Sequence, residues 1–200
     1  MDDLELADWR ERVARLYLSD ASLEDFRRGR DDLFASHPQS PIPAEARASF
    51  TGLPYYPPAA TAIIEAPVRA ADGPLEVDTG GPDGVVRYRR VAVADTTLGP
   101  LTLFWIDAYG GGLFVPVRDA TSGHGSYGGG RYLTDTVKGT FGRGLVILSP
   151  RSVRLDFNYL YNPSCSYNSL YACPLAPPEN RVSQRIEAGE LDYPRREEDG

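Results

Sequence analysis

The hydrophobic positions of the first fifty residues repeat at the spacing of amphipathic helices. Apolar side chains recur every three or four residues over residues 3–18, with charged residues between them, which predicts a helix with one buried face. That face consists of Leu6, Trp9, Val13 and Leu16. Ser22 followed by Asp25 resembles a capping box and predicts a second helix that ends near Phe34. Three prolines within residues 36–43 stop this helix.

From residue 61 onward the apolar positions alternate with polar ones, which is the pattern of β-strands. These alternating runs predict strands at residues 62–69, 75–79, 85–94, 98–108, 113–117, 145–148 and 153–158. Residues 80–84 (GGPDG) separate two of the runs and are typical of a hairpin turn. The pattern predicts a mainly β (α+β) fold, either an antiparallel β-barrel or a strongly bent β-sheet. Two N-terminal helices pack on this sheet, and a C-terminal proline-rich loop wraps over it.

The length of 200 residues is enough for one domain with its own core. We expect a helical part at residues 1–50, a β part at residues 51–190 and a frayed, charged tail at residues 191–200. The N-terminal residues are acidic and lack the basic and apolar stretches of a signal peptide, and no apolar run is long enough to span a membrane. We therefore expect a cytoplasmic protein without a membrane partner.

The formal net charge of −7 argues against a nucleic-acid partner, because nucleic-acid binding requires a basic surface. The charge is unevenly distributed along the chain. Residues 99–181 contain seven basic and five acidic side chains, so the negative charge lies in the helices and the tail. A small anionic ligand is therefore compatible with the middle of the chain.

A glycine-rich segment at residues 118–132 (RDATSGHGSYGGGRY) interrupts the pattern of strands and turns. Its glycines allow positive φ angles and leave backbone N–H groups uncovered, which suits a loop that closely approaches a ligand. The segment is not a phosphate-binding P-loop, because no Gly-Lys-Ser/Thr ending follows, and Ser126 lacks the spacing of a nucleophile elbow. A glycine-rich crossover between strands is the structural alternative.

Residues 155–180 form a second polar block, rich in tyrosine, asparagine and proline. It begins as a strand on which Arg154, Asp156 and Asn158 share one face, either as an exposed edge or as the wall of a polar pocket. Six tyrosines lie in or beside the two blocks: Tyr127, Tyr132, Tyr159, Tyr161, Tyr167 and Tyr171. Tyrosine suits a pocket for a small polar molecule because it combines an apolar ring with a hydroxyl group. Hydrogen bonds that hold irregular backbone would explain the same residues.

Several short motifs in these blocks carry a family resemblance. They are Tyr127-Gly-Gly-Gly-Arg-Tyr132, Leu155-Asp-Phe-Asn158, Tyr161-Asn-Pro163, Cys165-Ser-Tyr-Asn168, Cys173-Pro174, Pro178-Glu-Asn180 and Ile186-Glu-Ala-Gly-Glu190, with Phe50-Thr-Gly-Leu53 and Asp119-Ala-Thr-Ser-Gly123 upstream. In this order they resemble the signature of the bacterial and archaeal domain-of-unknown-function family 1684. The resemblance covers nearly the whole chain. It implies that residues 118–190 hold the hallmark of the family, and it implies no activity.

We predict that the two blocks form a pocket that binds a small polar or anionic molecule, with Arg118 or Arg131 paired to its anionic group. The predicted ligand-binding residues are Arg118, Asp119, Tyr127, Arg131, Tyr132, Asn158, Tyr161, Asn162, Tyr167 and Asn168. The first alternative is an enzyme that acts on a small molecule in the same pocket, with Asp156 as general acid or base and further carboxylates at Glu179 and Glu190. The second alternative is a structural or interaction module without a ligand site.

The sequence contains two cysteines, Cys165 and Cys173, which we expect to be a structural pair within a loop. They could form a disulfide if the fold brings their Cα atoms within about 7 Å. Zinc at Cys165 and Cys173 is disfavoured, because a structural site needs four ligands and the sequence offers only His37 and His124 as histidines. A nucleophilic cysteine has no histidine fixed beside it by sequence. No strand–glycine–helix unit for a flavin or dinucleotide occurs, so we predict no cofactor.

Overall fold

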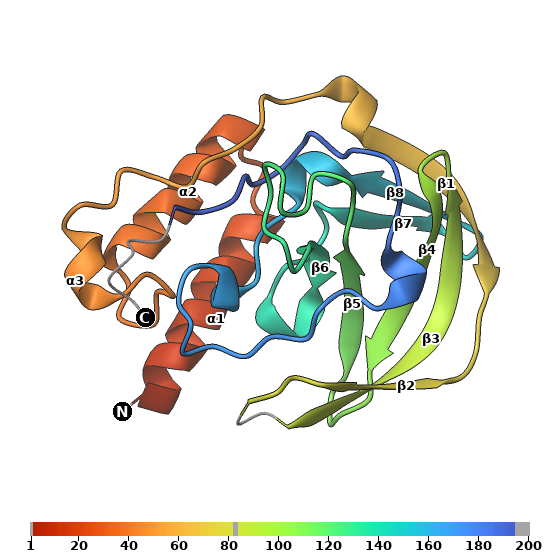
Figure 1. The fold of residues 1–200 in the computed structure, drawn as a ribbon, viewed down its shortest axis with the longest axis horizontal. Helices are drawn as coiled ribbons and strands as arrows, with labels where there is room; N and C mark the ends of the chain where they lie inside the picture. The colour runs from red at the N-terminus through yellow and green to blue at the C-terminus, as the bar shows by residue number, and fades with distance from the viewer. Residues whose placement is uncertain (1, 82–83, 195–200) are drawn as a thin grey trace.

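The computed structural model describes residues 2–81 and 84–194 of the chain (Figure 1). The α-helices of these ranges are α1 (Asp2–Leu18), α2 (Leu23–Ser36) and α3 (Ala44–Arg47). The strands are β1 (Ile63–Ala70), β2 (Pro74–Asp78), β3 (Val85–Thr96), β4 (Gly99–Ile106), β5 (Gly112–Val117), β6 (Arg131–Asp135), β7 (Leu145–Ser149) and β8 (Ser152–Asp156). The predicted frayed tail falls largely on residues 195–200, which lie outside the described residues.

The two predicted N-terminal helices are confirmed as α1 and α2, which lie side by side at one edge of the molecule (Figure 1). The N–H of Asp25 donates to Oγ of Ser22 at 3.1 Å, so the predicted cap starts α2. Val13 and Tyr17 of α1 and Phe26 of α2 are buried together between the two helices. No helix in the described ranges is long and apolar enough to span a bilayer.

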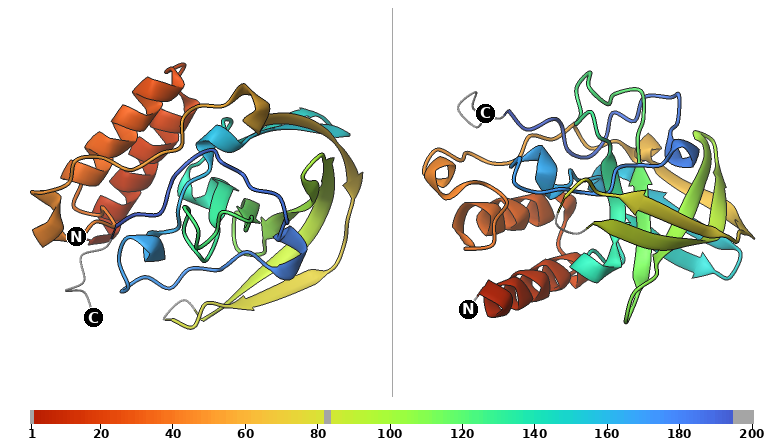
Figure 2. Two further views of the ribbon diagram at one scale, coloured as in Figure 1. Left: turned by 45° about the horizontal axis from the view of Figure 1, so that its top comes forward. Right: turned by 60° about the horizontal axis from the view of Figure 1, so that its bottom comes forward.

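The strands form one antiparallel sheet that curls strongly into a half-barrel (Figure 2). Its order is β6-β5-β4-β3-β1-β8-β7, and β2 pairs with the first half of β3 beside this path. The register of β3 against β4 shifts between Arg90 and Ala92, and such a bulge increases the local bend. The first half of β3 therefore pairs with β2 and the second half pairs with β1. The predicted strongly bent antiparallel sheet is confirmed.

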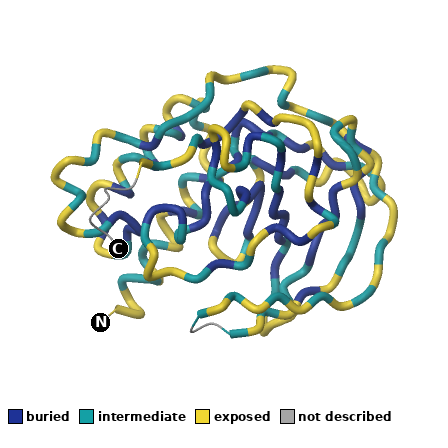
Figure 3. The backbone as a smooth tube through the Cα atoms, viewed as in Figure 1, coloured by how far each residue is buried: buried dark blue, intermediate teal, exposed yellow. Residues whose placement is uncertain are grey.

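One face of the half-barrel is covered by the C-terminal part of the chain, residues 174–191, which we call the closing segment. The buried side chains of this face come from the strands and include Leu101, Val115, Leu133 and Leu155. Val182, Ile186 and Ala188 of the closing segment pack into the same cluster. Figure 2 shows the closing segment in blue along the inside of the curl, and Figure 3 shows the buried backbone concentrated there. The sheet and the closing segment thus share one core.

Aromatic side chains cover the opposite face of the sheet and connect it to the helices. Tyr88 stacks on Phe114 with ring centroids 5.4 Å apart, and Phe114 contacts Tyr132 edge to face at 4.8 Å. Tyr132 in turn contacts Tyr161, and Tyr161 contacts Tyr17 of α1. This aromatic row positions α1 and α2 against the sheet and the segment that follows β8.

The glycine-rich segment ends earlier than the sequence pattern indicates. We predicted a loop over residues 118–132, but Arg131 and Tyr132 are the first residues of β6. Every residue of β6 is buried, although three of its five side chains are Arg131, Thr134 and Asp135. The polar composition hid the strand, because alternation of apolar and polar residues is absent when both faces are covered.

Candidate functional site

The charged residues that flank the glycine-rich segment are buried together under the closing segment. Arg131 is fully buried, and its Nη2 donates to Oδ1 of Asp119 at 3.1 Å. Oδ2 of Asp119 accepts the N–H of Ile186 at 2.7 Å. The guanidinium of Arg131 also donates to the carbonyl oxygens of Ile186, Ala188 and Glu190. The structure therefore places Arg131 and Asp119 in the interior, where they hold the backbone of the closing segment.

A second buried ion pair joins α2 to the end of the closing segment. Arg30 Nη2 pairs with Glu190 Oε1, and the two side chains are 8% and 1% exposed. Oε2 of Glu190 accepts the hydroxyl of Tyr167 and, at 2.9 Å, the N–H of Asn162. Burial lowers the pKa of Arg30, but the Glu190 carboxylate and the neighbouring hydroxyls of Tyr55, Tyr17 and Tyr167 together outweigh this effect and hold the pKa well above its usual range. Arg30 therefore carries its charge inside the protein, beside Glu190.

A small cavity lies beside this ion pair, between the two long helices and the segments that follow β6 and β8. Its polar lining consists of Arg30, Tyr132, Lys138, Thr140, Tyr161, Asn162, Ser164 and Tyr167. Trp9 of α1 and Phe34 of α2 supply aromatic walls. We call this space the tyrosine cavity. It brings together four of the residues predicted to bind a ligand: Tyr132, Tyr161, Asn162 and Tyr167.

The tyrosine hydroxyls of the cavity are neutral at physiological pH. Burial raises the pKa of Tyr132, Tyr161 and Tyr167 well above the usual range for a phenol. Tyr132 and Tyr167 each donate to an oxygen of the protein. The hydroxyl of Tyr161 has a weaker contact, with the Thr140 hydroxyl at 3.4 Å. Tyr161 is therefore the hydroxyl of this set that is most available to a ligand.

Two further polar groups of the cavity have unused hydrogen-bonding capacity. Asn162 donates from Nδ2 to the Leu191 carbonyl at 2.7 Å, but its buried Oδ1 has no donor within the described residues. Nζ of Lys138 lies 3.9 Å from Oδ2 of Asp135, which is beyond hydrogen-bond distance. The cavity volume is about 70 Å³. One molecule of liquid water occupies roughly 30 Å³, so the space accepts about two waters or one compact polar group.

The other predicted ligand-binding residues lie outside the tyrosine cavity. Besides Asp119 and Arg131, described above, they are Arg118, Tyr127, Asn158 and Asn168. The Asn158 amide exchanges two hydrogen bonds with the backbone of Ala59, at 2.9 and 3.0 Å. The backbone of Arg118 pairs with residues 180–182, and Oδ1 of Asn168 accepts the N–H of Leu170. The Tyr127 hydroxyl lies 3.6 Å from Sγ of Cys165. The contacts of Asn158 and Asn168 hold irregular backbone.

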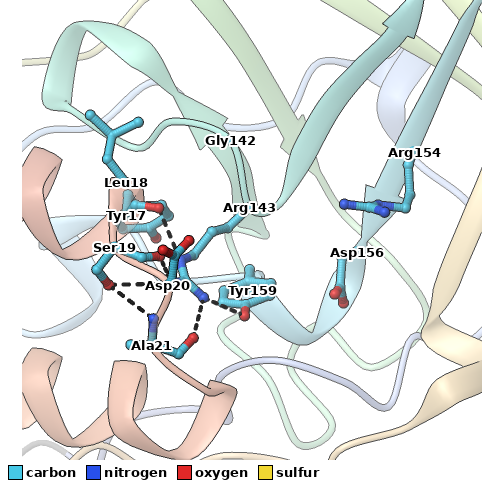
Figure 4. A pocket seen from close by; sticks show the side chains of 10 residues that line it. All are labelled: Tyr17, Leu18, Ser19, Asp20, Ala21, Gly142, Arg143, Arg154, Asp156 and Tyr159. Carbon is cyan, nitrogen blue, oxygen red and sulfur yellow. Dashed lines mark hydrogen bonds between the residues drawn. The ribbon is translucent and has the colours of Figure 1, made fainter.

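Asp156, the predicted general acid or base, lines a different pocket, which lies between the end of α1 and β8 (Figure 4). We call it the α1–β8 pocket; its volume is about 430 Å³. Figure 4 shows Arg154 and Asp156 on β8, across the pocket from Arg143 and Tyr159. Oδ1 of Asp156 accepts the N–H of Asn158 at 3.0 Å and caps the short 3-10 helix that follows β8. The structure thus separates Asp156 from Tyr132, Tyr161 and Tyr167, whereas Tyr159 lines the same pocket as Asp156.

The two arginines of the α1–β8 pocket differ in the hydrogen bonds that they make within the protein. Arg143 donates to the carbonyl oxygens of Tyr17 at 2.9 Å and Ala21 at 3.0 Å, and to the Tyr159 hydroxyl at 2.8 Å. It therefore holds the C-terminal end of α1. The exposed side chain of Arg154 makes no hydrogen bond or ion pair within residues 2–81 and 84–194. Arg154 is thus the arginine of this pocket that the fold leaves uncommitted.

Arg30 and Lys138 belong to the tyrosine cavity but were not predicted from the sequence. Arg30 lies four residues after Phe26 and four before Phe34, on the buried face of α2. This helical spacing is the sequence feature from which the burial of Arg30 could have been predicted. Lys138 ends a short 3-10 helix after β6, and its sequence context carries no comparable signal. Within the described residues no group of three or more histidine, cysteine, aspartate or glutamate side chains is placed to hold a metal ion.

Comparison with known proteins gives a family without an assigned activity. The profile of the family described as "Protein of unknown function (DUF1684)" matches residues 48–191. The solution NMR structure of an uncharacterised protein from Haloarcula marismortui is 35% identical to this chain, with a TM-score of 0.59. That likeness covers 84% of this chain and 91% of the other. No curated protein matches the chain. The family match includes the sheet and the closing segment, whereas α1 and α2 lie before it.

Proposed function

We propose that this chain, which belongs to the DUF1684 family of proteins of unknown function, binds a small polar or anionic molecule in the tyrosine cavity. The observation that carries the proposal is the unused acceptor of Asn162, buried at a cavity that also contains Lys138 and the Tyr161 hydroxyl. A buried polar atom without a partner costs about 1–3 kcal/mol, and a bound donor removes that cost. Polar groups that converge in this way on an enclosed space are typical of small-molecule sites.

The hydrogen-bond donors and acceptors that line the tyrosine cavity define the chemical class of the proposed ligand. Lys138 requires an anionic or carbonyl acceptor, and Oδ1 of Asn162 requires a donor such as a hydroxyl group. Arg30 is paired with Glu190, whereas Lys138 lies 3.9 Å from Asp135 and keeps half of its side chain exposed, so Lys138 is the cationic group of the cavity that can turn to a ligand. The volume of about 70 Å³ limits the enclosed part to a few heavy atoms. A compact hydroxy acid, or the hydroxy-acid end of a longer molecule, meets these requirements.

The single lysine of the sequence provides a direct test. Reductive methylation with ¹³C-formaldehyde keeps the charge of Lys138 and places an NMR reporter at the cavity, and the labelled N-terminal amine serves as an internal control. Titration with glycolate is expected to shift the Lys138 resonance saturably with millimolar affinity, about −4 kcal/mol, and to leave the N-terminal resonance unchanged. Ethylene glycol, which lacks the carboxylate, is the matched negative probe.

Tyrosine substitutions then assign the effect to the cavity. Tyr161→Phe is expected to weaken glycolate binding several-fold, whereas Tyr159→Phe, in the α1–β8 pocket, leaves it unchanged. A shift that does not saturate, or an equal response to ethylene glycol, would show that the cavity is not a site for this chemistry.

A second candidate function is an enzyme that acts on a small anionic molecule in the α1–β8 pocket. Its volume of about 430 Å³ falls within the range of small-molecule sites, and Arg154 offers an uncommitted guanidinium beside the Asp156 carboxylate. Asp156 would act as general acid or base. Asp156→Asn decides between binding and catalysis: loss of turnover with retained binding supports the role, and retained turnover of the identified substrate excludes it.

A further inference from the structure

Cys165 and Cys173 lie at opposite ends of a loop that folds back on itself. Cys165 belongs to the short 3-10 helix Ser164–Ser166, and Pro174 follows Cys173. The N–H of Cys165 donates to Sγ of Cys173 at 3.4 Å. The structure thus brings the two cysteines predicted as a structural pair into direct contact, and both carry thiols.

The contact positions the two sulfur atoms for bond formation. The Cys165 amide nitrogen is two bonds from its own Cβ, so a sulfur in contact with that amide lies beside the Cys165 side chain. Rotation about χ1 then brings the two Sγ atoms together without a large movement of the backbone. A hydrogen bond with the Cys165 thiol, together with burial, raises the pKa of the Cys173 thiol.

The two cysteine residues differ in their exposure to solvent. Cys173 is buried at 9% exposure, whereas Cys165 is intermediate in exposure. The Tyr127 hydroxyl, 3.6 Å from Sγ of Cys165, offers a hydrogen-bond partner to that sulfur. An accessible thiol with a buried thiol in contact behind it is the arrangement of an attacking and a resolving cysteine.

We propose that Cys165 and Cys173 form a redox-active dithiol that reacts with low-molecular-weight disulfides of the glutathione class. This inference is independent of ligand binding in the tyrosine cavity. The Cys165 thiolate attacks one sulfur of the small disulfide, which forms a mixed disulfide and releases one small thiol. Sγ of Cys173, after loss of its proton, attacks Sγ of Cys165, forms the protein disulfide and releases the second small thiol. The protein loses two protons and two electrons, and the small disulfide gains them.

The experiment follows this reaction by mass spectrometry after alkylation of remaining thiols. Wild-type protein in excess glutathione disulfide is expected to lose the mass of two hydrogens, with peptide mapping that joins Cys165 to Cys173. Cys173→Ser is expected to accumulate a stable glutathione adduct at Cys165. Cys165→Ser is expected to form an adduct at least about tenfold more slowly, because its remaining thiol is buried.

A matched control variant gives the rate at which an ordinary thiol on the same loop reacts with glutathione disulfide. Ser169→Cys, introduced into the variant that lacks both native cysteines, places one thiol at an exposed position between them. The proposal is overturned if the wild type accumulates the glutathione adduct or stays reduced while this control reacts, or if Cys165→Ser reacts as fast as Cys173→Ser. The wild-type result does not depend on the folding of any variant.

Discussion

Glu190→Gln tests whether the buried ion pair with Arg30 holds the closing segment to the helices. The substitution keeps the shape of the side chain and an oxygen acceptor for Tyr167 and Asn162, but it removes the charge that balances Arg30. The two side chains are 8% and 1% exposed, so water cannot replace the lost partner. Removal of one partner from a buried pair costs about 3–5 kcal/mol.

The closing segment contains its own control. Glu187 pairs with Arg185 at 2.9 Å, but these two side chains are 59% and 50% exposed. Glu187→Gln therefore removes the same charge from the same segment at a solvated site, at a cost of about 0–1 kcal/mol. For a chain of this length, the buried substitution is expected to lower Tm by roughly 6–20 °C, and the exposed one by roughly 0–4 °C.

Urea unfolding, followed by tryptophan fluorescence, gives the free energy of unfolding of both variants. The two values are compared directly where the m-values are equal. A double-mutant cycle with Arg30→Met isolates the pairwise contribution, because the double variant leaves no unbalanced buried charge. The double variant is expected to be more stable than the sum of the single effects predicts. Equal costs for Glu190→Gln and Glu187→Gln, or additive single effects in the cycle, would refute the reasoning.

Three further predictions, one of them with a control substitution, test other parts of the fold. Burial raises the pKa of Asp135 in the folded protein. The stabilisation from this shift is present below the usual carboxyl range, and it is lost as the pH rises through the raised pKa. Asp135→Asn should therefore flatten the pH dependence of the urea midpoint between acidic and neutral pH, and an unchanged slope would contradict this. A Cβ at Gly144 would lie 2.1 Å from the Leu133 carbonyl oxygen, so Gly144→Ala should lower the free energy of unfolding by about 1–3 kcal/mol. Gly128→Ala, whose added Cβ would make only ordinary contacts, should not lower it measurably in the same urea assay. Arg143→Met removes the donors that hold the end of α1 and should accelerate hydrogen exchange in its last turn, whereas unchanged protection there would assign the cap to other groups.

The parts of the fold that could be predicted from the sequence are those specified by local patterns. The helices followed from apolar spacing and from the Ser22 cap, and most strands followed from alternation between residues 62 and 117. β6 could not be predicted in this way, because its first residue is a fully buried arginine. Arg131 is compatible with a buried strand because it pairs with Asp119 and donates to carbonyl groups at residues 186–190, more than fifty positions away. Periodicity carries no information about these partners.

The candidate site shows the same division between local and distant information. The tyrosine and asparagine composition of residues 155–180 indicated polar lining, and Tyr161 and Asn162 lie at the tyrosine cavity. Composition could not separate the residues of the cavity from Asp156, because neighbouring residues of this part of the chain line two different spaces. The cavity also depends on Arg30 of α2, which reaches the site only after the helices dock on the sheet.

The polar side chains around the closing segment are there for a physical reason. That reason also shows which polar atoms to consider in a search for a ligand site. The closing segment covers one face of the half-barrel without strand geometry, so its backbone groups need partners from side chains. Arg131 satisfies three of its carbonyls, and Asp119 accepts the N–H of Ile186. Once such groups are assigned to the fold, the polar atoms left over are informative, since the fold gives no reason for them. Oδ1 of Asn162 is such an atom, and it is buried at the cavity that Lys138 also lines, which is the space we propose for a ligand.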